Sequence, residues 1–259
     1  MTEVHRSHPR DFVASLDKGL KVLLCFDRKN SKLSLSDVAR LTGCTPAAAR
    51  RFLMTLEALD FLHSNGKQFW VAPRTLLLAR PYLTSRAAPQ VAQPILDKLA
   101  DRTRQSASLG LLLDSEVLII ARSTGRRTLS TGLGIGSRLP VFCSALGRAL
   151  LSRLSAEEVL EHLSAVALEK LTPKTVDSVS SAAESVARCR SLGWAECDEE
   201  LEMGVRSIAV PIPNTSSKTI AALSLSVRAE RMTMDEFRLA HLAAIEEARD
   251  ELVRSKATF

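Results

Sequence analysis

The stretch TPAAARRFLMTLEALDFLHSNGKQFWVAP, residues 45–73, predicts a helix that is followed directly by a β-hairpin. Thr45 is a favourable N-cap and Pro46 a favourable first helical residue, so we expect a helix from Pro46 to about Leu59. The short runs FLHS and KQFWV then flank Asn65-Gly66, the pair best suited to a type I′ turn. A hairpin this close to the helix end indicates a compact helix-hairpin unit.

The predicted helix has two contrasting sides. The apolar stripe consists of Ala49, Phe52, Leu53 and Leu56. The other side carries small side chains beside Arg50 and Arg51. A helix that enters the major groove of DNA needs small residues near the phosphates and long donors that reach base edges. The alternative is that the alanines only favour helix formation and the arginines are solvated.

The preceding residues supply two more helices. One begins near Ser15, a candidate cap, and places Leu16, Leu20, Leu23 and Leu24 at helical spacing. The second, SDVARLTG, ends at Gly43. Helix, turn, helix and hairpin together predict a winged helix-turn-helix, with Lys67 at the wing tip contacting phosphate. The expected DNA-binding residues are Ser36, Thr45, Ala47, Ala48, Arg50, Arg51, Thr55, Asn65 and Lys67.

Charge is distributed unevenly along the 259 residues. Residues 1–88 hold 14 Lys and Arg against 7 Asp and Glu, whereas residues 89–259 hold 21 against 22, giving balances of +7 and −1. A basic balance in one segment is the footprint of a nucleic-acid-binding module, although chance asymmetry remains the alternative. The chain lacks the long apolar run of a membrane span or signal peptide, so we expect a cytoplasmic protein. Its five scattered cysteines predict reduced thiols, no metal site and no cofactor.

Residues 89–259 alternate between helical and strand patterns. Strand runs such as SASLGLLL and EVLIIARS are joined by a short turn at Asp114-Ser115, and RSIAVPIP precedes KTIAALSLSV. Adjacent strands with short turns predict an antiparallel sheet flanked by helices, and the whole chain is therefore α+β. In KTIAALSLSV, Ser224 and Ser226 share one face of the strand, which suits a pocket floor or a solvent side.

Three motifs here invite chemical interpretations. TGLGIGSRLP alternates glycines but lacks the strand-loop-helix spacing of a dinucleotide site, so we interpret it as a loop over a pocket. Cys143-Ser144, with His162 downstream, lacks a nucleophile elbow, and Ser144 reads better as the N-cap of a helix whose Ala145 and Leu146 amides favour an anion. The acidic run CDEELEMG has no nearby histidine and predicts a solvated turn.

The segments SLDKGLKVLLCF, LSLSDVARLTGCTPAAARRFLMTLEALDFL and FWVAPRTLLL resemble the winged helix-turn-helix of the IclR family of bacterial transcription regulators. RLPVFCSALGRALL and GWAECDEELEMGVRSIAVPI resemble that family's GAF-like effector-binding domain. AAARRFLMTL with FWVAPR is most similar to the subgroup that controls catabolism of aromatic acids through protocatechuate or 4-hydroxybenzoate. The resemblance spans nearly all of residues 15–254.

The resemblance implies a domain organisation and an effector site. The expected segments are a flexible tail at 1–14, the DNA-binding domain at 15–73, a linker helix at 74–88 and the effector-binding domain at 89–259. The family's pocket draws on the strands that carry Ser207 and Ser224, and its border includes the Asp198 turn. The expected effector-binding residues are Thr131, Leu133, Arg138, Leu139, Ser144, Ala145, Leu146, Asp198, Ser207, Ser224 and Ser226, with Arg138 as added positive charge for a carboxylate.

The leading hypothesis is a transcriptional regulator without enzymatic activity, whose operator binding or activation responds to a small organic acid, an aromatic acid or a β-ketoadipate pathway metabolite. Its expected partners are double-stranded operator DNA, the acid and a second copy in a homodimer or a dimer of dimers. RNA polymerase is a further candidate partner. Two alternatives are a GAF-like small-molecule enzyme with a basic appendage, which turnover of a bound acid would support, and a nucleic-acid-binding protein with a well-packed, empty C-terminal core.

Overall fold

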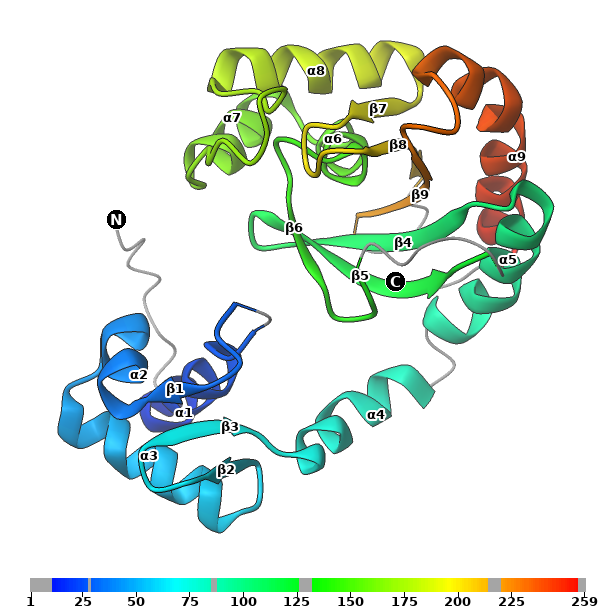
Figure 1. The fold of residues 1–259 in the computed structure, drawn as a ribbon. Helices are drawn as coiled ribbons and strands as arrows, with labels where there is room; N and C mark the ends of the chain where they lie inside the picture. The colour runs from blue at the N-terminus through cyan, green and yellow to red at the C-terminus, as the bar shows by residue number, and fades with distance from the viewer. Residues whose placement is uncertain (1–10, 28, 85–87, 126–131, 214–219, 256–259) are drawn as a thin grey trace. The chain divides into compact units, whose positions relative to one another are not determined.

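The computed structural model describes residues 11–27, 29–84, 88–125, 132–213 and 220–255. The chain divides into two compact units, with the boundary between Tyr82 and Leu83 (Figure 1). The predicted flexible tail falls largely on residues 1–10, which lie outside the described ranges. No described helix is both long enough and apolar enough to cross a membrane.

The N-terminal unit is a winged helix-turn-helix, as the sequence predicts. Its core is formed by the helices and the small sheet together, with Val22, Leu53 and Leu62 fully buried. The strand order is β1-β3-β2, and both pairs are antiparallel. The elements are α1 (Ala14–Leu24), β1 (Leu33–Ser34), α2 (Leu35–Thr42), α3 (Pro46–Ala58), β2 (Leu62–Ser64), β3 (Gln68–Val71), a 3₁₀ turn η1 (Pro73–Thr75) and α4 (Leu76–Thr84).

Local chemistry explains most of these boundaries. The Thr45 hydroxyl accepts a hydrogen bond from the Ala48 amide, so Thr45 caps α3 as expected, and Gly43 ends α2 with a φ of 68°. The Ser15 cap is wrong, because α1 begins one residue earlier, after Val13, whose side chain makes no capping hydrogen bond. Ser15 therefore lies inside the first turn.

The hairpin forms, but its predicted turn type is wrong. A type I′ turn requires positive φ at both central residues, whereas between Ser64 and Gln68 only Gly66 has a positive φ, of 84°. The Asn65 side chain instead accepts hydrogen bonds from the amides of Lys67 and Gln68, at 3.1 and 2.9 Å. This local side-chain cap replaces one of the backbone bonds of the expected turn.

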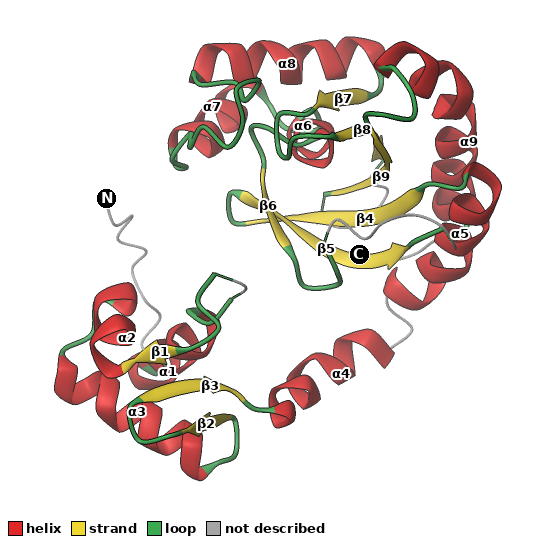
Figure 2. Ribbon diagram, in the orientation of Figure 1, coloured by secondary structure: helices red, strands yellow, loops and turns green. Residues whose placement is uncertain are grey.

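The C-terminal unit is a six-stranded antiparallel sheet covered by helices on both faces (Figure 2). The strand order is β6-β5-β4-β9-β8-β7. The elements are α5 (Ala88–Thr103), β4 (Ser106–Leu113), β5 (Glu116–Ser123), β6 (Arg138–Pro140), α6 (Ala145–Leu151), α7 (Ala156–Ser164), α8 (Val179–Leu192), β7 (Ala195–Asp198), β8 (Val205–Ile212), β9 (Ala221–Arg228) and α9 (Met234–Arg254). This arrangement confirms the predicted α+β class.

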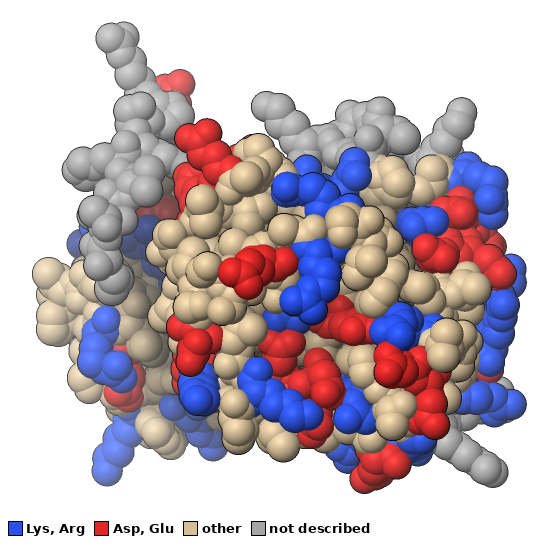
Figure 3. Space-filling view, turned by 90° about the horizontal axis from the view of Figure 1, so that it is seen from above, with Lys and Arg blue, Asp and Glu red and all other residues tan. Residues whose placement is uncertain are grey.

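Two apolar cores lie on opposite faces of this sheet. One packs α5 and α9 against side chains such as Leu223 and Leu225, and the other packs α6 and α8 against side chains such as Ile119 and Ala209. On the side of the molecular surface that Figure 3 shows, acidic and basic side chains are interspersed. The helices on the second face leave room beside the sheet, and a cavity lies there.

Candidate functional site

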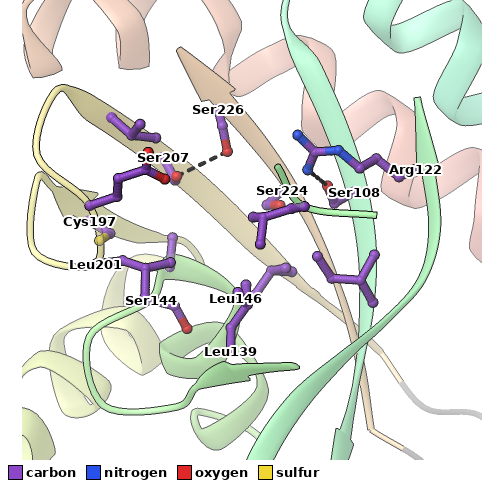
Figure 4. Close-up of a pocket in the computed structure, with 15 residues that line it drawn as sticks. Ser108, Arg122, Leu139, Ser144, Leu146, Cys197, Leu201, Ser207, Ser224 and Ser226 are labelled. Atoms are coloured by element: carbon purple, nitrogen blue, oxygen red, sulfur yellow. Dashed lines mark hydrogen bonds between the residues drawn. The ribbon is translucent and has the colours of Figure 1, made fainter. Parts of the chain in front are cut away.

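The cavity in the C-terminal unit lies between the sheet and the start of α6 (Figure 4). The space between its lining atoms is about 520 Å³ when open solvent at its mouth is counted, and about 30 Å³ of it can hold the centre of a water molecule. Its lining comes from β4, β5, β6, β7, β8, β9, α6 and the loops beside them. The lining residues are Ser108, Ile119, Arg122, Leu133, Leu139, Ser144, Ala145, Leu146, Cys197, Leu201, Glu202, Val205, Ser207, Ser224 and Ser226.

Serine hydroxyls form the floor of the cavity across three neighbouring strands. Ser224 on β9 stands opposite Ser108 on β4, and Ser226 stands opposite Ser207 on β8. The Ser207 and Ser226 hydroxyls are 3.0 Å apart and hydrogen-bonded. Strand alternation explains the arrangement, because the intervening Leu225 enters the core on the other face. The expected pocket side of Ser224 and Ser226 is therefore their side in the structure.

Arg122, a residue that the sequence analysis missed, lies at one end of this floor. Its Nη1 donates a hydrogen bond to the Ser108 hydroxyl at 2.7 Å. Burial lowers the pKa of the Arg122 guanidinium, but an arginine remains protonated at neutral pH. The cavity thus contains a half-buried positive charge fixed by a hydroxyl.

The opposite end of the cavity is formed by the turn between β7 and β8, which carries Leu201 and Glu202. The turn is held by Glu199, whose φ is 58° and whose carboxylate accepts the Gly204 amide at 2.9 Å. The Thr172 hydroxyl donates to the Glu199 carbonyl at 2.7 Å. Glu202 itself is exposed at the cavity mouth and makes no ion pair within the described residues. A clamped turn therefore presents a carboxylate to the cavity.

A buried ion pair supports both the turn and α6. Arg148 donates from Nη1 and Nη2 to the two carboxylate oxygens of Glu200, and the side chains are only 6% and 13% exposed. Burial alone would lower the pKa of Arg148, but hydrogen bonding to Glu200 outweighs it and raises the pKa. The expectation of a solvated acidic turn is wrong here, because Glu199 is also largely buried, beside Lys174 and Arg206.

Two residues assigned to the pocket from sequence line other surfaces. Arg138 is exposed on β6 and pairs with Glu116, because strand alternation turns its neighbour Leu139 inward instead. Asp198 forms ion pairs with Arg206 and Lys174, and it lines a separate cavity beside α8. Thr131 lies outside the described residues. The remaining predicted residues, Leu133, Leu139, Ser144, Ala145, Leu146, Ser207, Ser224 and Ser226, all line the cavity.

Groups that could suggest nucleophilic chemistry are engaged elsewhere. Ser144 caps α6 by accepting the Gly147 amide at 3.1 Å and donates to the Pro140 carbonyl. Burial raises the pKa of the Cys143 thiol to about 12. His162 contacts the Ser115 hydroxyl at 3.1 Å rather than Cys143 or Ser144. All five cysteines are free, and the described residues contain no cluster of three or more metal-ligating side chains.

In the N-terminal unit, the residues predicted to bind DNA lie on the surface. Ser36, Thr45, Ala47, Arg50, Arg51, Thr55, Asn65 and Lys67 are exposed, and Ala48 is partly buried. Arg50 and Arg51 form no ion pair with a described carboxylate. The apolar stripe of α3 packs inward, with Ala49 and Leu53 fully buried. The helix thus presents its arginines outward.

A winged helix-turn-helix joined to a domain whose cavity is lined by serine hydroxyls and an arginine is typical of a ligand-responsive DNA-binding protein. Residues 15–66 match the IclR helix-turn-helix domain, and residues 81–253 match the C-terminal domain of bacterial IclR transcriptional regulators. The chain belongs to the IclR family and is a transcriptional regulator with an effector-binding C-terminal domain.

Several characterised proteins are similar over most of this chain. The Pca regulon regulatory protein of Pseudomonas putida is 36% identical over 227 residues, which cover 87% of this chain and 78% of that protein. The p-hydroxybenzoate hydroxylase transcriptional activator of Acinetobacter baylyi is 34% identical and covers 86% of this chain and 84% of its own. Both relatives are transcriptional regulators.

Solved structures share the fold. A transcriptional regulator from Rhodococcus is 35% identical, with a TM-score of 0.76 over 94% of this chain and 98% of its own. The inducer-binding domain of PobR from Acinetobacter, a double mutant in complex with 3-hydroxybenzoic acid, is 32% identical with a TM-score of 0.59. It covers 63% of this chain and 96% of that domain.

Proposed function

We propose that the effector of this regulator is a small aromatic carboxylic acid with a hydroxyl group opposite the carboxylate, as in 4-hydroxybenzoate. The observation that supports this most directly is the polarity of the cavity, whose lining contains both Arg122 and Glu202; Leu201, the neighbour of Glu202 in the chain, lies across the cavity from Arg122 in Figure 4. The names of the similar regulators of the pca regulon and of p-hydroxybenzoate hydroxylase point to the same class of compound.

The proposed orientation follows from charge. The carboxylate lies at Arg122 and Ser108, where a fixed guanidinium and a hydroxyl provide charge-assisted hydrogen bonds. This replaces the expectation that the carboxylate lies at the Ala145 and Leu146 amides with Arg138 as added charge, because Arg138 is exposed and pairs with Glu116. Glu202 repels a carboxylate but accepts a hydrogen bond from a ring hydroxyl, and the Ser224 and Ser226 hydroxyls flank the ring between the two ends. Leu139 and Leu146 cover its apolar face.

Calorimetric titration tests the proposal with 4-hydroxybenzoate, benzoate and the neutral 4-hydroxybenzamide. We expect Arg122→Met to weaken 4-hydroxybenzoate binding about 10- to 150-fold, the loss of a hydrogen bond to a charged group, worth about 1.5–3 kcal/mol. Arg138→Met is the matched control, because it removes the same charge outside the cavity and should leave affinity unchanged. Equal losses in both variants, or binding of the amide as tight as that of the acid, would refute the orientation.

The proposal assigns operator binding to α3 and the wing. Arg50 and Arg51 reach base edges in the major groove, the alanines allow close approach of the backbone, and Lys67 contacts phosphate beside it. Ser36, Thr45, Thr55 and Asn65 complete the contact surface. Because such a regulator works on the bacterial chromosome, the proposal includes a cytoplasmic location.

We also infer that a second copy covers the apolar surface of the N-terminal unit. A groove of about 940 Å³ runs between α1 and α3 to Leu78 on α4. Leu16 and Leu20 line the groove and are about half exposed or more, and so are Leu24 on α1 and Leu76 and Leu77 on α4. Apolar surface of this extent favours association, and a two-fold dimer matches a palindromic operator. Analytical ultracentrifugation that shows a monomer at micromolar concentration would refute the dimer.

A further inference from the structure

Gln93 on α5 connects the outside of the effector domain to the strand that carries Arg122. Its Nε2 donates a hydrogen bond to the backbone carbonyl of Arg122 at 3.1 Å. Among the described residues, β6 pairs with residues 116–118 of β5 and does not extend to Arg122. Gln93 therefore donates to a backbone carbonyl of the residue whose side chain lines the cavity.

A second glutamine connects α5 to the end of α4. The Gln90 Nε2 donates to the backbone carbonyl of Thr84 at 3.0 Å. Thr84 is the last residue of α4, and residues 76–82 of that helix belong to the DNA-binding unit. Figure 1 shows α5 beside the end of β5. A continuous path of two hydrogen bonds and one helix turn therefore runs from Arg122 to α4.

We propose that Gln93 and Gln90 carry effector occupancy from Arg122 to α4, and so change operator affinity. The inference rests on the proposed function, because it requires a ligand that binds Arg122. When a bound carboxylate draws the Arg122 side chain toward it, the backbone carbonyl of Arg122 also moves. Gln93, which is hydrogen-bonded to that carbonyl, then shifts together with α5. An effector alters the operator equilibrium only through contacts that differ between two states of the protein, and the proposal assigns that difference to these two hydrogen bonds.

Gln93 could instead serve stability alone, and its second hydrogen bond separates the two roles. The same Nε2 donates to Asp97 on α5 at 2.9 Å, one helical turn further along. Asp97→Ala removes this bond within the helix and leaves the bond to β5 intact. Gln93→Met keeps the length and apolar contacts of the side chain and removes both donors. A purely structural role of Gln93 predicts similar effects of Gln93→Met and Asp97→Ala, whereas the relay requires Gln93 and not Asp97.

The experiment measures two affinities with the full-length protein. Fluorescence anisotropy gives the operator Kd with and without saturating 4-hydroxybenzoate, and calorimetry gives the 4-hydroxybenzoate Kd without DNA. We expect Gln93→Met to leave the effector Kd within about twofold of the parent protein. The factor by which saturating 4-hydroxybenzoate changes the operator Kd, called the ratio below, should become about 2- to 12-fold smaller than in the parent protein. This is the equivalent of one lost hydrogen bond. Gln90→Met should reduce the ratio similarly, and Asp97→Ala should not.

A Gln93→Met protein that keeps the full ratio overturns the relay, as does a loss of equal size in Asp97→Ala. If 4-hydroxybenzoate does not bind the parent protein, the proposed effector fails, and hydrogen exchange of the unliganded protein then decides about the relay. Amides of residues 76–84 should exchange faster in both Gln93→Met and Gln90→Met than in the parent. Unchanged exchange in Gln93→Met overturns the relay irrespective of the effector.

Discussion

Removal of the buried Arg148–Glu200 pair should show an unusual order of stabilities, in which a double variant is more stable than a single one. In Arg148→Met, the Glu200 carboxylate loses both guanidinium hydrogen bonds while it remains 87% buried. The carbonyls of Glu196 and Phe142 also lose their Arg148 donors. In Arg148→Met with Glu200→Met, those carbonyls are still unpaired, but no charge is buried.

The comparison of these two variants isolates the charge, because both lack Arg148. An uncompensated buried charge costs about 3–5 kcal/mol, and a pair of apolar side chains of similar volume is often neutral. Since Glu200 keeps slight exposure, we take the lower end and expect the double variant to be about 3 kcal/mol more stable than Arg148→Met. Both should be less stable than the parent protein, because the two carbonyls remain unsatisfied.

Urea denaturation followed by Trp194 fluorescence measures this difference, because Trp194 lies in the effector domain beside the ion pair. The other tryptophan, Trp70, is replaced by phenylalanine in all proteins so that only this domain is observed. The surface pair Lys98–Glu251 is the control, and its corresponding methionine variants should show coupling below about 1 kcal/mol. A double variant as unstable as Arg148→Met would refute the reasoning.

Three further predictions address the DNA-binding helix, α6 and pH. Arg51→Ala should cost about 1–3 kcal/mol at the operator, whereas Lys67→Ala should weaken all duplexes alike and reduce the salt slope by about one; equal losses on specific and random DNA in Arg51→Ala would contradict base readout. Gly147→Ala should abolish effector binding, because an added Cβ would lie 2.3 Å from the Val141 carbonyl oxygen, and calorimetry with unchanged affinity would contradict this. Partial burial opposes ionisation of Asp198, but hydrogen bonds and ion pairs with Arg206 and Lys174 outweigh it and lower the pKa of Asp198. The stability that ionised Asp198 contributes is therefore complete above its pKa in the unfolded chain, about 3.9, and is lost as the pH falls through its lower pKa in the folded protein. The stability difference between the parent protein and Asp198→Asn should therefore shrink from pH 7 to pH 3 in urea denaturation, and a constant difference would contradict the ion pairing.

The sequence predicts those parts of the fold that depend on local signals. Thr45 and Gly43 mark helix boundaries through capping chemistry that needs no tertiary partner. The alternation of Ser224 with Leu225 predicts which face of β9 is polar, because one strand contains the whole signal. The choice between cavity and solvent for that face came only from the resemblance to a family.

Arg122 could not be found in this way, because the strand that carries it breaks the alternation. A register shift between Leu109 and Gly110 leaves Ile120 as an extra residue on β5. Ile119 and Arg122 consequently line the same cavity although three positions separate them. Strict alternation would assign them to opposite faces. The register of β5 with its hairpin neighbour β4, including this bulge, places Arg122 opposite Ser108.

The serine floor of the cavity has a consequence for how such regulators acquire new ligands. A hydroxyl can donate or accept simply by rotating, so the polarity of Ser108, Ser207, Ser224 and Ser226 is not fixed by the backbone that holds them. An acid with its substituent at another ring position requires a different set of donors and acceptors, and rotation of a few hydroxyls can provide it. Exchange of one serine for alanine or threonine would then shift ligand preference while the sheet beneath stays intact. The strands serve as a durable frame, and selection can retune chemical preference one small side chain at a time.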